Sequence, residues 1–146
     1  MQKKIEDAMA DFKDKGVDVY YKDGFVYVDM ADKLLYKSGS AALGDEGKKA
    51  IGVLANALNG YPNLKVIVLG NTDDKPIKQG GDKWSLSTER ANGVVRILAD
   101  DQVNPARLTA GGKGKYPPIA DNSTEEGRAK NRRTEIILNP DLDKLW

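Results

Sequence analysis

Residues 66–90 read VIVLGNTDDKPIKQGGDKWSLSTER, and this stretch joins an apolar run to a helix-like segment through a polar loop. The run from Val66 to Leu69 is aliphatic without alternation, which is the pattern of a strand covered on both faces. Gly70 ends the run, and most residues from there to Gly81 are turn and loop formers without a helical period. The stretch therefore predicts a strand, a loop and then a helix.

The predicted helix has a clear start and an apolar face. Ser85 or Ser87 can cap its N-terminus, and Glu89 lies early, where a carboxylate suits the positive end of a helix. The residues of its predicted buried stripe are Ala91, Val94, Val95 and Leu98. A strand that feeds such a helix places the intervening loop at the carboxyl edge of the sheet, beside helix N–H groups that attract anions.

An acid and a base lie at this junction, because the loop contains Asp73 and the helix contains Arg90. A carboxylate can accept hydrogen bonds from an ammonium, while a guanidinium and backbone N–H groups can hold a carboxylate. The pair therefore suits the zwitterionic group of an amino acid. The alternative interpretation is an internal salt bridge that only fixes the loop.

Four spaced motifs of this chain occur in the same order in a known family. They are G-x-T-D at Gly70 to Asp73, L-S-x-x-R-A at Leu86 to Ala91, G-x-G-x-x-x-P near Gly112 to Pro118, and N-R-R-x-E at Asn131 to Glu135. With them the chain resembles the OmpA C-terminal domain family, which includes peptidoglycan-associated lipoprotein and the periplasmic part of flagellar motor protein B. The resemblance covers residues 17–139.

The resemblance implies an α+β fold, a βαβαβ sandwich in which two long helices pack on one face of a mixed β-sheet. It implies three segments: a helix or linker end at 1–16, the OmpA-like domain at 17–140 and a C-terminal extension at 141–146. It also implies noncovalent binding of peptidoglycan through the diaminopimelate of the stem peptide, which anchors an outer-membrane or envelope protein to the cell wall. The expected location is the periplasm, attached to the outer membrane through an upstream segment.

The resemblance also assigns ligand-binding residues. It implies that Asp73 binds the diaminopimelate ammonium and that Arg90 binds its carboxylate. The other positions of the predicted pocket are Thr72, Arg132, Asn71 and Lys83. Two of them depart from the family pattern, because Asn71 replaces a common histidine and Lys83 stands where many relatives carry a ligand-holding asparagine.

Composition excludes several other classes of function. The 146 residues contain no Cys and no His, which excludes thiolate or histidine metal sites, cysteine nucleophiles and a Ser-His-Asp hydrolase. A formal net charge of +1 provides no overall field for nucleic acid or a membrane surface. We expect no metal and no cofactor. An enzyme acting on wall glycan would need a carboxylate pair such as Asp73 with Asp74 or Asp82, which is weak evidence, and we expect no enzyme.

The N-terminal segment allows two interpretations. Residues 2–15 read as an amphipathic helix with Ile5, Met9 and Phe12 on one stripe. The stripe can pad the core or end a longer linker, and we favour the linker. This stripe and the helix faces of the domain are also candidate surfaces for a homodimer or another envelope partner, which is our alternative function. No signal-peptide core or membrane-spanning run is present, so the chain is cytosolic or an excised domain with an added Met, and the resemblance favours excision.

The remaining elements follow from periodicity and turn residues. Asp23-Gly24 between two β-rich runs predicts a hairpin. The predicted strands and helix are Val17 to Tyr21, Phe25 to Asp29, a helix from Asp45 or Glu46 to about Leu58, Leu108 to Gly111, and Thr134 to Leu138. The residues from Gly111 to Asn131 form a long polar connection of a kind that is often functional. Arg132 and Arg133 must face opposite sides at the start of the last strand.

Overall fold

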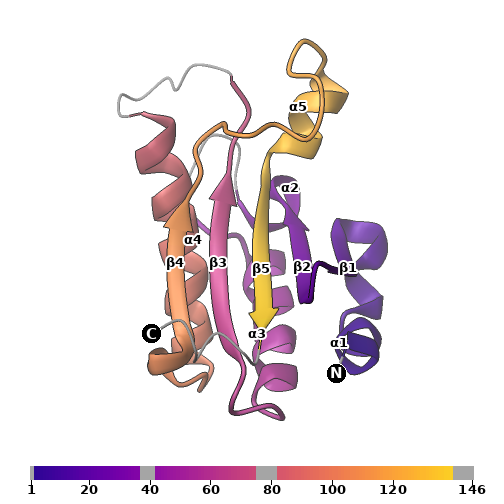
Figure 1. Ribbon diagram of the computed structural model, residues 1–146, viewed down its shortest axis with the longest axis vertical. Coiled ribbons are helices and arrows are strands. Elements are labelled where there is room, and N and C mark those ends of the chain that lie inside the picture. The colour runs from indigo at the N-terminus through magenta and orange to yellow at the C-terminus, as the bar shows by residue number, and fades with distance from the viewer. Residues whose placement is uncertain (1, 37–41, 75–81, 140–146) are drawn as a thin grey trace.

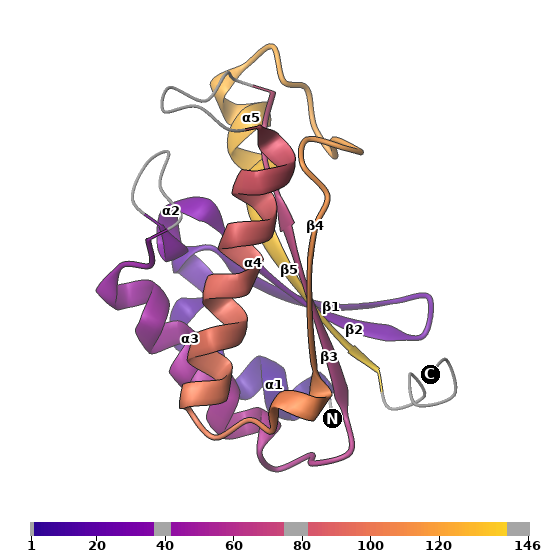
Figure 2. The same cartoon turned by 90° about the vertical axis from the view of Figure 1, so that its left-hand side faces the viewer.

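The computed structural model describes residues 2–36, 42–74 and 82–139. Its fold is a five-stranded mixed sheet with helices on one face (Figures 1 and 2). Its strands are β1 (Val17–Lys22), β2 (Phe25–Ala31), β3 (Lys65–Asn71), β4 (Leu108–Gly112) and β5 (Arg133–Asn139). Their order is β1-β2-β5-β3-β4; β3 and β4 are parallel, and the other neighbours are antiparallel. The α+β fold class, with two long helices on one face of a mixed sheet, is confirmed.

The two long helices are α3 (Asp45–Leu58) and α4 (Lys83–Asp100). The shorter helical segments are α1 (Gln2–Ala8), η1 (Ala10–Lys15), α2 (Asp32–Leu35), η2 (Pro105–Arg107) and α5 (Glu125–Asn131). The predicted helix from residue 45 to residue 58 is therefore confirmed. The helix α5 was not predicted, although its signals are in the sequence: Thr124 caps it by accepting from the N–H of Gly127, and two Glu occupy its first turn.

The hairpin prediction is confirmed in detail. Asp23 and Gly24 are the two turn residues between β1 and β2, with φ of 54° and 90°. Two consecutive positive φ angles are typical of a type I′ turn, whose twist matches the flanking strands. Asp tolerates this conformation and Gly adopts it without strain.

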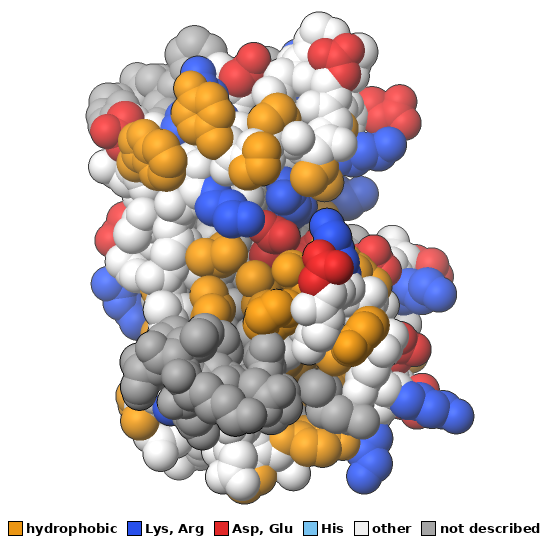
Figure 3. All heavy atoms as spheres, in the orientation of Figure 1, with side chains coloured by type: hydrophobic (Ala, Val, Ile, Leu, Met, Phe, Trp, Pro, Cys, Tyr) orange, Lys and Arg blue, Asp and Glu red, His pale blue; other side chains and the backbone are white. Residues whose placement is uncertain are grey.

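The core lies between the sheet and the helices. Val66 and Val68 of β3 are fully buried against them, while Ile67 and Leu69 are only half-buried. The prediction that this strand is covered on both faces is therefore wrong, because the long helices cover one face of the sheet (Figure 2). On the opposite face, hydrophobic side chains lie among acidic and basic ones (Figure 3). The predicted stripe of α4 is buried except for Val95, which is half-buried.

The N-terminal stripe belongs to the same core. Ile5 is 0% exposed, Met9 1% and Phe12 4%, and all three pack in one cluster with the sheet residues. Of the two interpretations, core packing describes this stripe, and its residues are not available as a docking surface. The boundary at residue 17 stays a prediction, and the extension from residue 141 lies outside the described residues.

The start of α4 differs from the prediction. The N-cap is Asp82, whose Oδ1 accepts from the Ser85 N–H at 2.7 Å, so neither Ser85 nor Ser87 caps the helix. Ser87 is instead buried, and its hydroxyl accepts from the N–H of Gly114 at 2.9 Å. This contact ties α4 to the segment that follows β4.

Two glycines in neighbouring strands let α4 lie directly on the sheet. Gly70 of β3 pairs with Gly112 of β4, and a Cβ at Gly70 would collide with the carbonyl of Ser87. A Cβ at Gly112 would collide with Ser87 and Thr88. This part of α4 can therefore approach the ends of β3 and β4 only because both positions lack side chains.

We expect Gly70→Ala to lower the free energy of unfolding by about 2 kcal/mol or more, because overpacking against helix backbone has no cheap relaxation. Gly52→Ala on α3 is the matched control, since its Cβ would meet only the side-chain end of Asp101, at 3.4 Å. The control should preserve or raise stability, because alanine favours helix. Urea unfolding of both variants measures the difference, and equal stabilities would contradict this account.

Asp29 of β2, on the other face of the sheet, makes the free energy of unfolding depend on pH. Burial raises the pKa of this carboxyl to about 6, despite a 2.8 Å hydrogen bond from Tyr20 Oη that lowers it. The pKa of Asp29 is therefore higher in the folded protein than in the unfolded chain. The protonated carboxyl stabilises the fold at low pH, and this contribution is lost as the pH rises through about 6.

We therefore expect Asp29→Asn to gain stability relative to the wild type between pH 4 and pH 7, by about 1–2 kcal/mol at the upper end. Urea unfolding across this pH range measures it. Asp7→Asn, at an exposed position, is the control for the change of charge. A constant difference between wild type and Asp29→Asn at every pH would show that Asp29 does not titrate in this window.

Candidate functional site

The predicted site residues lie around the carboxyl end of β3, in the upper part of Figure 1. Asn71, Thr72 and Asp73 are 3%, 3% and 4% exposed, and Arg90 is 3% exposed. Asp73 and Arg90 thus lie near the predicted carboxyl edge of the sheet, but both are buried there and not exposed to solvent. Both charges are buried, so removing either one will affect stability as well as any binding.

Among the described residues, two cations from different parts of the chain contact Asp73. Its Oδ1 lies 3.2 Å from the Lys83 ammonium at the start of α4, and its Oδ2 lies 2.7 Å from Nη1 of Arg132. The loop at Asp73 and the start of α4 are thus joined to the segment before β5 through one carboxylate.

Arg90 pairs with an acid that the sequence analysis did not identify. Its Nη1 lies 2.7 Å from Oδ1 of Asp32, the first residue of α2. The guanidinium carbon also lies 4.9 Å from the centre of the Tyr36 ring, and the Tyr36 hydroxyl donates to the Arg90 carbonyl at 2.8 Å. Burial raises the pKa of Asp32, and the nearby Arg90 and Arg132 charges oppose that shift.

A sequence signal for Asp32 does exist. It directly follows β2, and β2 runs parallel to β3 because both are antiparallel to β5. Carboxyl ends of parallel strands meet at the same edge of a sheet, so Asp32 and Asp73 had to lie at one edge. Glu125 could not be placed in this way, because α5 was not predicted.

Arg132 links the two acids into one cluster. Besides Asp73, it contacts Oε1 of Glu125 with Nη2 at 2.6 Å, and its Nε lies 4.0 Å from Oδ2 of Asp32. We call the six residues Asp32, Asp73, Lys83, Arg90, Glu125 and Arg132 the charged cluster. It contains three acids and three bases. The salt-bridge interpretation predicts a pair between Asp73 and Arg90. Ion pairs within the described residues join Asp73 to Lys83 and Arg132, and Arg90 to Asp32.

The two remaining predicted residues have different surroundings. Asn71 donates to Oε1 of Glu135 at 2.9 Å, in a neighbouring network that also includes Lys113 and Arg133. The backbone N–H of Thr72 donates to the Gly114 carbonyl at 2.7 Å, which fixes the loop next to Asp73. Arg132 and Arg133 therefore face different networks, as the alternation at the start of β5 predicts.

The connection between β4 and α5 is fixed over the same end of the sheet. Asn131, which is 1% exposed, accepts from the N–H groups of Ile119 and Ala120 at 2.8 and 3.0 Å. Its side-chain amide donates to the Ala120 carbonyl at 3.0 Å. The first asparagine of the N-R-R-x-E motif thus holds the loop that precedes Arg132.

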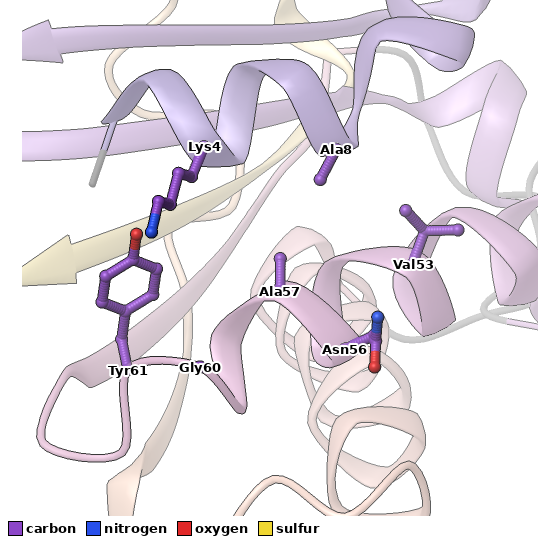
Figure 4. Close-up of a pocket in the computed structure, with 7 residues that line it drawn as sticks. All are labelled: Lys4, Ala8, Val53, Asn56, Ala57, Gly60 and Tyr61. Atoms are coloured by element: carbon purple, nitrogen blue, oxygen red, sulfur yellow. The ribbon is translucent and has the colours of Figure 1, made fainter.

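A pocket lies between α1 and α3 (Figure 4). Figure 1 labels these two helices near the end of the sheet opposite to the carboxyl end of β3. The pocket is open and has a volume of about 480 Å³. Its lining includes Lys4 and Ala8 of α1, Val53, Asn56 and Ala57 of α3, and Tyr61. Lys4 is the charged residue of this lining, so the pocket does not offer the paired charges that a zwitterion needs.

Within the described ranges, no three His, Cys, Asp or Glu residues are grouped so that they could hold a metal ion. In the same ranges, no helix has the length and apolar character that crossing a membrane requires.

The chain is similar in sequence and in structure to proteins of one family. The model of the OmpA family matches residues 35–132. The probable lipoprotein YiaD of Escherichia coli is 35% identical over 139 residues, which are 94% of this chain and 60% of that protein. The peptidoglycan-binding protein ArfA of Mycobacterium tuberculosis is 35% identical over 69% of this chain and 32% of its own length. The chain thus spans from about a third to three fifths of these curated relatives.

Among solved structures, the cell wall anchor of the T6SS from Pseudomonas aeruginosa superimposes with a TM-score of 0.86 at 31% identity. The match covers 95% of this chain and 99% of that one. Two of these relatives, ArfA and the cell wall anchor, are named for peptidoglycan binding and for anchoring, in agreement with the expectation that this chain is not an enzyme.

The buried pair makes a specific prediction about stability. We expect Arg90→Met to lower the free energy of unfolding by about 3 kcal/mol or more, because it leaves the Asp32 carboxylate buried without its nearest cation. The double variant Arg90→Met with Asp32→Asn should recover at least about 1 kcal/mol of that loss. Denaturant unfolding of the two single variants and the double variant measures the coupling, and additive losses would contradict it.

Proposed function

We propose that this chain, which belongs to the OmpA family, binds peptidoglycan noncovalently through the diaminopimelate of the stem peptide. By this binding it anchors an envelope component to the cell wall. The attachment to the outer membrane through an upstream segment, and the periplasmic location, are parts of the same proposal. The relatives support it, because one is named for peptidoglycan binding and another is a cell wall anchor.

The observation that carries the proposal is the charged cluster at the carboxyl end of β3. Asp73 and Arg90 are opposite charges on the loop and the helix of one crossover unit. Arg132 lies near both Asp73 and Asp32, and Asp32 is the partner of Arg90. Buried charges are costly unless they are paired, so a site that keeps three acids and three bases together can accept a ligand that brings one charge of each sign.

Diaminopimelate is such a ligand. The free end of its side chain carries an ammonium and a carboxylate on one carbon. We assign the ammonium to Asp73, and the carboxylate to the guanidinium of Arg90, with Arg132 beside it. Lysine in the same place of the stem peptide would supply the ammonium alone, and the arginine would lose its partner.

Binding to isolated cell wall tests the proposal. We expect Asp73→Asn to weaken cosedimentation with diaminopimelate-type wall at least tenfold, since it removes the charge that the ammonium needs. The variant keeps the shape of the side chain. Asp74→Asn is the matched control, because Asp74 is the exposed neighbour and the charge change is identical.

Thermal unfolding establishes that both variants are folded before the assay. Wild-type binding that Asp73→Asn retains in full would refute the site assignment. Failure of the folded wild type to sediment with the wall would refute the function itself.

A further inference from the structure

Lys83 is placed against the group to which we assign the ligand ammonium. It is the first residue of α4, and its ammonium lies 3.2 Å from Oδ1 of Asp73. The Lys83 side chain is 18% exposed and that of Asp73 is 6% exposed. An ammonium of this chain therefore already occupies one oxygen of the carboxylate.

The two cations on Asp73 are held with different strength. Arg132 lies between Asp73 at 2.7 Å and Glu125 at 2.6 Å, so it is fixed from both sides. Among the described residues, Asp73 is the one carboxylate within 4.0 Å of the Lys83 ammonium. Lys83 also has a flexible four-carbon stem, so it can leave Asp73 more easily than the guanidinium can.

We infer that Lys83 is an internal competitor for the ligand ammonium and that its ammonium marks the position that the ligand takes. The inference rests on the proposed function. Two ammonium groups on one carboxylate oxygen repel each other, so the ligand enters when Lys83 moves away. The measured association constant is then the intrinsic association constant multiplied by the fraction of molecules in which Lys83 has left Asp73.

The place of Lys83 in the helix makes its departure costly. The first turn of a helix carries a partial positive charge, which disfavours a cation there. Asp73 offsets this repulsion as long as the ion pair exists. Lys83 therefore lowers affinity by the same factor for every ligand whose ammonium binds Asp73, while the carboxylate contact at Arg90 distinguishes diaminopimelate from lysine in the stem peptide.

Calorimetric titration of meso-diaminopimelate into wild type and Lys83→Met tests the inference. Methionine keeps most of the apolar stem and removes the charge, so we expect binding that is about threefold to tenfold tighter. Lys113→Met is the matched control, because Lys113 pairs with Glu135 at 3.5 Å and changes the net charge equally. The affinity of the control should stay within about twofold of the wild type.

The outcomes separate this inference from the function on which it rests. Tighter binding by Lys83→Met alone supports it. Unchanged or weaker binding by Lys83→Met, with a wild type that binds, overturns the inference and leaves the proposed function in place. No binding by any of the three folded proteins overturns both.

A second measurement observes the displacement itself. The side-chain ammonium of Lys83, followed by NMR with Lys83→Met as the assignment control, should show an ion-paired signal in the free protein. Saturation with meso-diaminopimelate should remove that signal and leave the Lys113 signal unchanged. Persistence of the ion-paired Lys83 signal in the saturated complex would overturn the inference.

Discussion

The close approach of α4 to the sheet at Gly70 and Gly112 is the constraint on which the site depends. Ser87 and Thr88 occupy the space that two side chains would otherwise fill. Because the helix is fixed there, Lys83 lies one turn before the contact and Arg90 lies just after it. Both cations are thereby brought to the edge where β2 and β3 end, and where Asp32 and Asp73 leave the sheet.

The charged cluster keeps opposite charges together at the edge of the sheet. Each of its buried charges has a partner within the cluster, and this offsets the cost of removing the charges from water. A zwitterion with one ammonium and one carboxylate exchanges these partners without leaving a net buried charge. The pairs within the cluster therefore keep six charges together at one edge of the sheet, and under the proposed function Lys83 competes with the ligand ammonium for Asp73.

Much of the fold follows from local patterns, whereas the partners of the site residues do not. The turn at Asp23-Gly24 and the helix from Asp45 to Leu58 depend on short-range signals, so the sequence predicts both. The cap at Asp82 and the half-buried face of β3 were missed because they depend on a choice among competing caps and on what covers the sheet. The helix α5 was missed although its cap and its acidic first turn are local signals. The sequence identifies Asp73 and Arg90 as candidates but not their burial or the Arg90–Asp32 pair, which joins residues 58 positions apart.

The most direct test of the central claim is an NMR titration of the isotope-labelled domain with meso-diaminopimelate, compared with Nα-acetyl-L-lysine amide, which presents an ammonium without a carboxylate. We expect saturable shifts of backbone and side-chain signals around Asp73, Lys83 and Arg90, with clearly weaker binding of the lysine derivative. Saturable shifts confined to the pocket between α1 and α3, or no saturable shifts in a folded protein, would contradict it.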